Sequence, residues 1–298
     1  MKKFTLPFTS GIRYMLLSTL SFAVMNVFIK KVSNVPAMEV VFFRCLVSML
    51  LCLIIIYQDK ADWKGSNRKL LLARGIFGTI ALYTFFITLQ NIPLGTAVTI
   101  QYLSPIFTTV IAIFWLREKV KPLQWLFFAL SFAGVLVIKG FDNRISLTML
   151  AIGIVSALAS GFAYNMVRSL KEKEHTMVVV LHFQLVGVAT GLVGMLFNWR
   201  MPNGWEWFYL IMIGVCTQLG QVNLTKALQS ETMANVTIFN YVGIIYALGF
   251  GFLLFGEHYE GLAFAGIALV LTGVLLNYFY QRKQNKITPE EELTTVEE

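Results

Sequence analysis

Long apolar segments separated by short charged links make up this chain, and this alternation constrains its fold most. An apolar segment of about 20 residues is long enough to cross a bilayer as a helix. Periodicity, length and charge breaks together predict ten such segments. They are residues 12–32, 37–57, 69–90, 94–116, 121–138, 147–168, 176–197, 205–228, 231–255 and 260–280. Because lipid offers no partner for backbone N–H and C=O groups, we predict an all-α integral membrane protein with ten transmembrane helices.

The charges of this chain support a membrane location. Only 13% of the residues are charged, against roughly 25% in a soluble domain. The net charge of +8 does not indicate a nucleic-acid partner, because the basic residues lie at the edges of apolar segments. With the N-terminus inside, seventeen Lys and Arg residues fall on the inner side and five on the outer side. This bias predicts that both termini are cytoplasmic, and the short loops favour a bacterial inner membrane.

A constant offset of 139 residues relates the two halves of the chain. The pairs that share it are Asn26 and Asn165, Gln101 and Asn240, Tyr102 and Tyr241, Glu118 and Glu257, and Gly134 and Gly273. Five spans per copy is an odd number, so the second copy must enter the membrane in the opposite orientation. We therefore predict two inverted five-helix repeats, residues 12–139 and 147–280. A polar tail, residues 281–298, is predicted to be disordered and cytoplasmic.

The first copy carries short motifs that are typical of one transporter family. Ile92-Pro93-Leu94-Gly95 stands at the start of the fourth span, Ser104-Pro105 interrupts it, and Glu118 closes it. With the duplication, these motifs resemble the EamA-type repeat of the drug/metabolite transporter superfamily over residues 12–280. The resemblance implies a carrier of amino acids, nucleoside-like metabolites, vitamins or drugs, working by alternating access through a central cavity between the halves. The second copy departs from the pattern, since Gly243-Ile244 replaces Ser104-Pro105.

The proline in the fourth span predicts an irregular helix and a candidate substrate path. Pro105 lacks a backbone donor, which frees the carbonyl of Gln101. Gln101, Ser104 and Thr108 share one helix face with that carbonyl, so this face is predicted to line the path. The alternative is a proline kink whose free carbonyl is hydrogen-bonded by a neighbouring helix. We expect span four, rather than span nine, to be the more irregular.

Other uncharged polar and aromatic residues within spans are further candidates for substrate binding. Gln218 and Gln221 share a face of the eighth span, where they could line a cavity or join helices, and Tyr83 lies on an aromatic face of the third. Serines near the two asparagines of the first spans are expected to pack rather than bind. The complete candidate set is Asn26, Tyr83, Gln101, Tyr102, Ser104, Asn165, Gln218, Gln221, Asn240 and Tyr241.

Four ionisable residues are candidates for coupling or gating. Arg44 could pair with Glu39, reach a polar pocket, or bind an anionic group of the substrate. His182 could act as a proton switch or simply form a hydrogen bond within the packing. Glu118 and Glu257 close equivalent spans, where they could cap helix packing or form gate ion pairs. No carboxylate occupies the middle of a span, so we expect facilitated diffusion, exchange, or coupling through His182.

These features favour a secondary transporter of a small organic metabolite. We expect the protein to be a monomer or homodimer whose partners are its small-molecule substrate and membrane lipid. The alternative is a membrane-embedded structural or sensory protein, for which Gly187 and Gly191 offer a packing face. A membrane enzyme is disfavoured, because Asp and His are scarce within spans. No motif indicates a cofactor or metal site, and the three cysteines lie in apolar segments without paired spacing.

Overall fold

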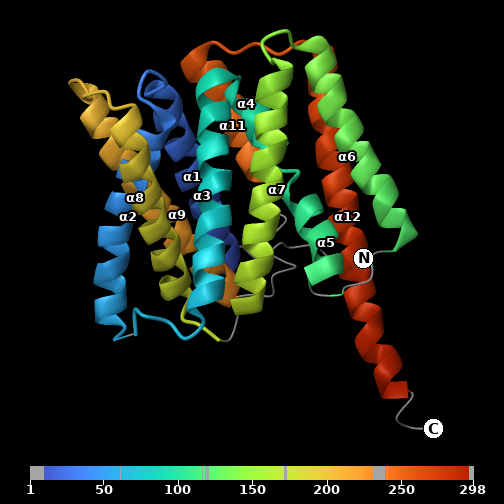
Figure 1. Cartoon of the computed structure of the whole chain (residues 1–298). Helices are drawn as coiled ribbons and strands as arrows, with labels where there is room; N and C mark the ends of the chain where they lie inside the picture. Colours follow the sequence, from blue (N-terminus) through green and yellow to red (C-terminus); the bar gives the residue numbers. More distant parts are fainter. Residues whose placement is uncertain are drawn as a thin grey trace.

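The computed structural model describes residues 10–60, 62–115, 117, 121–170, 173–230, 239 and 241–294. These residues form helices and, over the described ranges, no strand. The helices are α1 (Ser10–Lys31), α2 (Ala37–Gln58), α3 (Arg68–Asn91), α4 (Leu94–Gln101), α5 (Ser104–Trp115), α6 (Pro122–Phe141), α7 (Leu147–Leu170), α8 (Thr176–Phe197), α9 (Trp205–Ser230), α11 (Val242–Phe255) and α12 (Gly261–Thr294) (Figure 1).

Most of the predicted spans correspond to single helices whose bounds differ by a few residues. Within the described ranges, nine helical stretches are long and apolar enough to cross a membrane, α4 and α5 together counting as one. Of the predicted ninth span, residues 231–238 and 240 lie outside the described residues, and α11 covers residues 242–255. The prediction of a disordered tail from residue 281 was wrong as far as Thr294, because α12 continues through it.

The fourth span is broken at the predicted place. Helix α4 ends at Gln101 and α5 begins at Ser104, with Leu103 donating to the Ile100 carbonyl in a tight turn (3.0 Å). The ring of Pro105 cannot continue the α4 hydrogen-bond pattern, which accounts for the break. The predicted irregularity of span four is therefore confirmed. The first part of span nine lies outside the described residues, so the prediction that span four is the more irregular of the two stays a prediction.

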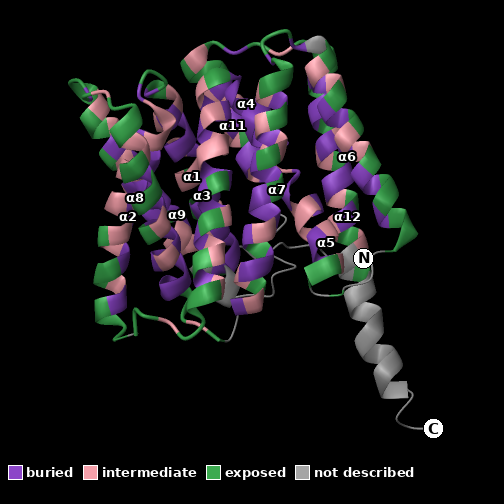
Figure 2. Cartoon of the chain, in the orientation of Figure 1, coloured by how far each residue is buried: buried purple, intermediate pink, exposed green. Residues whose placement is uncertain are grey.

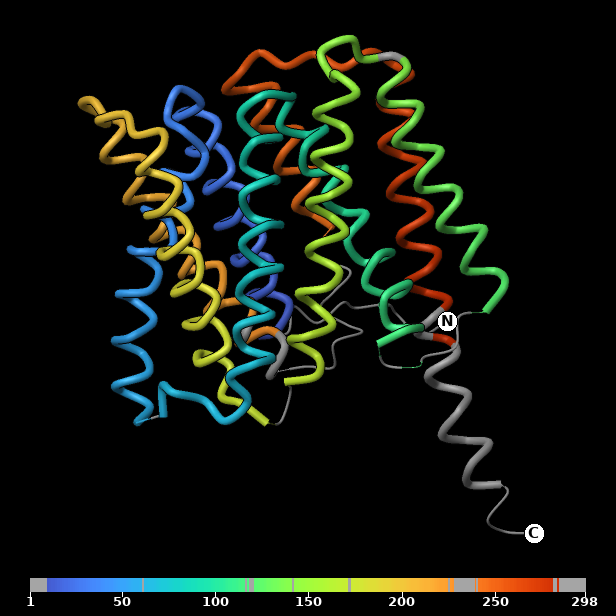
Figure 3. Tube along the Cα trace, viewed as in Figure 1, coloured from blue at the N-terminus to red at the C-terminus, as the bar shows by residue number. Residues whose placement is uncertain are grey.

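The two copies run in opposite directions and pack against each other, as Figure 3 shows along the chain. Lys30 near the end of α1 and Arg144 before the start of α7 both contact the loop between α11 and α12, so these first helices are antiparallel. We call this end of the bundle the Glu257 end, and the opposite end, where Glu174 lies, the Glu174 end. Two pairs of equivalent helices pack against each other across the copies, α2 with α8 and α6 with α12. Helix α4 also packs against α11, which is the equivalent of α5 by the 139-residue offset.

The crossing of α6 and α12 repeats the 139-residue offset in three dimensions. A Cβ at Gly134 would lie 2.6 Å from the carbonyl oxygen of Gly266, and one at Gly273 would lie 2.6 Å from that of Phe127. Gly266 and Phe127 are themselves 139 positions apart, so the two contacts are equivalent. The rings of Tyr102 and Tyr241 also meet, with centroids 5.2 Å apart. Both pairs show that a pseudo-two-fold axis relates the copies.

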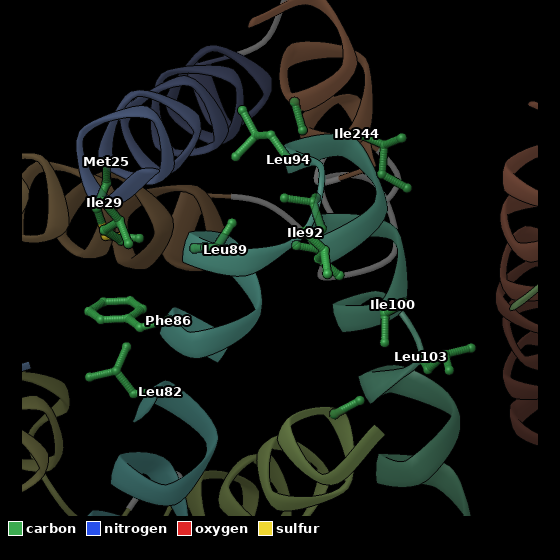
Figure 4. Close-up of a cluster of buried hydrophobic side chains, with 14 of the residues drawn as sticks. Met25, Ile29, Leu82, Phe86, Leu89, Ile92, Leu94, Ile100, Leu103 and Ile244 are labelled. Carbon is green, nitrogen blue, oxygen red and sulfur yellow. The ribbon is translucent and has the colours of Figure 1, made fainter. Parts of the chain in front are cut away.

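Apolar side chains fill the interior and also cover the outside. The main core joins both copies, for example Phe86 of α3 with Leu94 of α4 and Ile244 of α11 (Figure 4). Exposed residues recur along the helices on the outside of the bundle (Figure 2). Among them, Tyr57 and Phe197 are each 86% exposed. Apolar surface of this extent on long apolar helices is accommodated by lipid rather than water. The chain is a multi-pass membrane protein.

Candidate functional site

A chain of buried hydrogen bonds crosses the interior between α2, α8 and α9. Arg44 donates from Nη1 to the Gln184 side-chain oxygen (3.3 Å), and the Gln184 amide donates to the Ser48 hydroxyl (2.8 Å). The Ser48 hydroxyl in turn donates to the Gln218 side-chain oxygen (2.8 Å). None of the four residues is more than 4% exposed. Polar side chains are costly in an apolar interior, so a connected set of four is a candidate functional site.

The predicted alternatives for Arg44 can now be distinguished. Glu39 accepts a hydrogen bond from the Arg200 backbone (3.2 Å) instead of pairing with Arg44. Arg44 turns to Gln184 and lies over the ring of Phe183, so it reaches a polar pocket as one alternative proposed. Gln218 takes part in the same chain of bonds, and its Nε2 is buried without a partner. Gln221, on the same helix, is partly buried.

A second group of polar contacts surrounds the break between α4 and α5. Gln101 donates to the Ser160 hydroxyl and accepts from the Ser156 hydroxyl of α7, both at 2.8 Å. These serines, expected only to pack, therefore hold the Gln101 amide. Ser104 is buried, and its carbonyl accepts the Thr108 hydroxyl (2.7 Å). The amide of Gln101 thus joins helices here, and its predicted role in substrate binding stays a prediction.

The two asparagines of the first spans are both buried. Asn165 donates to the carbonyl of Thr108 (2.8 Å) and to that of Gly161 (3.0 Å). The side-chain oxygens of Asn26 and Asn165 are buried without a hydrogen-bond partner. Tyr83 is partly buried against the main core. Asn240 and Glu118 lie outside the described residues, so their predicted roles stay predictions.

His182 is fixed by its own helix. Its Nδ1 lies 2.9 Å from the carbonyl oxygen of Val178. A carbonyl only accepts hydrogen bonds, so Nδ1 carries the proton in this contact. This geometry fits the alternative of a hydrogen-bonded residue. Across the described ranges, no group of three or more His, Cys, Asp or Glu side chains gathers as a metal site would require.

At the Glu257 end, one buried carboxylate joins the two copies. Glu257 forms an ion pair with Lys30 of α1 (2.6 Å) and accepts the Tyr259 hydroxyl (2.8 Å). It also accepts the backbone N–H of Leu94, at 2.8 Å and 3.0 Å from its two oxygens. Leu94 is the first residue of α4, so the negative charge also stabilises the positive end of that helix dipole. Glu257 thus caps α4 and forms an ion pair in this clamp, which comprises Glu257, Lys30, Tyr259 and Leu94, and its predicted role in gating stays a prediction.

The linker between the copies is held at the same end. Arg144 binds Asp142 through two hydrogen bonds of 2.8 Å and donates to the His258 carbonyl (2.8 Å). Burial alone would raise the pKa of the Asp142 carboxyl, but the hydrogen bonds and charge of Arg144 together hold that pKa below its usual value. At the opposite end, Glu174 accepts the backbone N–H groups of Ser66 and Asn67 (2.6 Å each). Loops of the two copies are therefore tied at both ends.

The lowered pKa of Asp142 predicts a stability difference that depends on pH. Because its pKa is lower in the folded than in the unfolded protein, the ionised carboxylate stabilises the folded state, and this stabilisation is fully present above about pH 4. The contribution is lost as the pH falls through the lower folded value. We expect Asp142→Asn to reduce the melting temperature by a constant amount between pH 5 and 7, and the gap to the original protein to close below pH 3. An unchanged gap at low pH would contradict this assignment.

Three polar residues of this region, two of them buried and one partly buried, were missed by the sequence interpretation. Gln184 and Ser48 are polar residues inside apolar spans, which is the signal that could have found them. Arg74 was counted as a topology charge near the inner end of the third span. Its guanidinium instead lies over the Phe183 ring (4.3 Å), next to Arg44.

Comparisons with known proteins agree with this architecture. The model of the EamA-like transporter family matches residues 9–140 and again residues 147–279. The pseudopaline exporter CntI of Pseudomonas aeruginosa is 29% identical over 269 residues, which covers 89% of this chain and 95% of the relative. Human solute carrier family 35 member G1 is 28% identical, covering 83% of this chain and 73% of the relative.

A more distant relative and a solved structure extend the comparison. The riboflavin transporter of Vibrio cholerae is 27% identical over 199 residues, covering 65% of this chain and 66% of the relative. A solved crystal structure with 16% identity has the same fold, with a TM-score of 0.61 over 92% of this chain and 97% of its own. The relatives are transporters, and the family model matches both copies of the repeat. The chain therefore belongs to the EamA-like transporter family.

Proposed function

We propose that this protein is a secondary transporter that moves a small organic metabolite across the cytoplasmic membrane, with both termini in the cytoplasm. The observation that carries the proposal is the buried chain from Arg44 through Gln184 and Ser48 to Gln218. Helices that only needed to pack would be more stable with apolar side chains at these positions. The named transporters among the relatives support the same reading.

Alternating access between the two copies is the mechanism we propose. The clamp of Glu257, Lys30 and Leu94 links α1 and α4 of the first copy to the second copy at one end. Opening that end requires the ion pair to separate, so the clamp acts as a gate. The position equivalent to Lys30 in the second copy is Ser169, which carries no charge. The same ion pair therefore cannot form at the Glu174 end, and the two ends have different gates.

Reconstitution into liposomes tests the proposed transport. Proteoliposomes and protein-free liposomes are incubated with a mixture of amino acids, nucleosides and vitamins, and the trapped compounds are identified by mass spectrometry. We expect saturable, protein-dependent accumulation or exchange of at least one metabolite. Gln218→Leu should reduce this flux about tenfold, because it breaks the bond to Ser48.

A matched variant on the same helix controls for the loss of an amide. Asn223 of α9 donates only to the carbonyl of Leu219 in its own helix (2.9 Å). Asn223→Leu should therefore leave flux at the original level. Absence of flux for every compound in the mixture would support the structural or sensory alternative instead.

A further inference from the structure

Two arginines from different helices meet on one aromatic ring inside the bundle. The guanidinium carbon of Arg44 in α2 lies 5.3 Å from the ring centroid of Phe183 in α8. That of Arg74 in α3 lies 4.3 Å from the same centroid. Arg44 is 3% exposed and Phe183 is 5% exposed, whereas Arg74 is partly buried. Two positive charges are therefore neighbours in a region that otherwise consists of apolar helices.

The hydrogen-bonding capacity of this pair is largely unused. A guanidinium carries five N–H donors. Arg44 reaches Gln184 and the Cys45 sulfur from a single nitrogen, at 3.3 Å and 3.5 Å, and its Nε is buried without a partner. Both Nε and Nη1 of Arg74 are also buried without a partner. The Phe183 ring attracts the positive charge but offers no acceptor in place of a carboxylate.

No carboxylate of the described residues supplies a negative charge to this pair. Over the described ranges, neither guanidinium has a carboxylate within ion-pair distance, and the nearby Glu39 bonds to the Arg200 backbone. Like charges close together in an apolar region repel strongly, and an unpaired buried charge is costly. A pair of this kind is stable when something else provides the anion.

Arg74 points into the protein although a shorter route to water exists. It lies in the second turn of α3, near the Glu174 end, where long basic side chains usually extend to the membrane surface. Helical side chains also lean toward the N-terminus of their helix, which here is the same end. Instead, its Nη1 occupies the space beside Gly78, one turn deeper, where a Cβ would collide with it. Gly78 thus permits an inward orientation that brings the two arginines together.

We propose that Arg44 and Arg74 form a binding site for a carboxylate group of the substrate, which makes the transported compound an organic anion. This rests on the proposed transport function and names its substrate class. Guanidinium groups bind carboxylates through paired, charge-assisted hydrogen bonds. Gln218 adds a further buried donor, its unpartnered Nε2, at the other end of the Arg44 chain. The unpartnered nitrogens of Arg44, Arg74 and Gln218 are all donors, which suits a ligand rich in acceptors.

Binding and structural roles of the pair predict opposite effects on stability. If the arginines only held helices together, replacing either would lower the melting temperature. If the arginines instead bind an anion, replacing one of them in the ligand-free protein removes a repulsion between like charges. Arg44→Gln and Arg74→Gln should then leave the melting temperature of the ligand-free protein equal or higher, and should lose stabilisation by the ligand.

Thermal unfolding of the purified full chain in detergent tests the site directly. The probes are succinate, glutarate and citrate, with succinamide and glutaramide as uncharged counterparts and inorganic phosphate as a second oxyanion. We expect at least one carboxylate to raise the melting temperature and its amide not to. Each arginine substitution should raise the half-saturating concentration about tenfold or more. Lys226→Gln, which removes an exposed charge of α9, should not change the response.

The outcomes separate this site from the proposed transport. No shift with any carboxylate, a shift with phosphate alone, or a shift that survives both arginine substitutions would overturn the carboxylate site. If a carboxylate binds through the arginines but proteoliposomes move no metabolite, the site stands and the transport function fails. If metabolites move at equal rates with the original protein and both variants, transport stands and the site fails.

Discussion

Glu257→Gln is expected to lower the free energy of unfolding by about 3 kcal/mol, because it removes one partner from a buried ion pair. The side chain of Glu257 is 7% exposed and that of Lys30 is 15% exposed, so little water can solvate the Lys30 charge once the carboxylate is removed. Lys30 would keep its bond to the Ile92 carbonyl (2.7 Å) but would lose its counter-charge. A glutamine can accept the Leu94 N–H with one oxygen, so the cap of α4 is weakened rather than lost.

Unfolding in detergent by heat or by SDS measures this effect, and two variants control for it. Glu260→Gln makes the same charge change at an exposed position in the same loop, and should leave stability unchanged. Lys30→Met combined with Glu257→Gln should cost less than the two single substitutions together, because no unpaired charge remains. Additive effects would show that Glu257 and Lys30 are not coupled, and would remove the argument for a gate.

The substitution Glu257→Gln also tests which end of the bundle the clamp keeps closed. Weakening the clamp should favour the state that is open at the Glu257 end, since the copies are no longer tied there. A single cysteine introduced at Thr96, which is fully buried in α4, reports on this. In a background without the three native cysteines, its labelling by a water-soluble maleimide should be faster with Glu257→Gln than without it.

Much of the fold could be predicted because its signals are local or periodic. Apolar length predicted the helices, Pro105 predicted the break between α4 and α5, and the 139-residue offset predicted the paired copies. The contact of Gly134 with Gly266 and that of Gly273 with Phe127 show that this offset is a symmetry of packing. Apolar length and the proline break follow from rules that hold for membrane helices in general, and the offset follows from the duplication of the chain.

The polar interior was harder to predict because it depends on where side chains turn. Arg74 has the position of a topology charge, and only the space beside Gly78 reveals that it points inward. Gln184 is a single amide in a strongly apolar helix, and its partners Arg44 and Ser48 are far away in sequence. Spacing along one helix identifies a shared face, but it does not identify the helix that this face meets.

Gly134→Ala should destabilise the protein by about 1–3 kcal/mol, although alanine is the better helix former. The added Cβ would lie 2.6 Å from the Gly266 carbonyl oxygen and 2.7 Å from the Val270 backbone nitrogen. Both atoms belong to the backbone of α12, so no side-chain rotation relieves the contact and the two helices must separate. Close approach through small residues is a main source of helix association in lipid, which makes this crossing sensitive to a single methyl group.

The matched control for this prediction is Gly249 of α11, where a Cβ would have nothing within 4 Å. Gly249→Ala should leave the melting temperature equal or higher, whereas Gly134→Ala should lower it by on the order of 5 °C. Gly273→Ala should resemble Gly134→Ala, because its Cβ meets the Phe127 carbonyl oxygen across the same axis. If Gly134→Ala and Gly249→Ala behaved alike, the helices could not be in contact at this crossing, and the pseudo-two-fold arrangement of α6 and α12 would have to be revised.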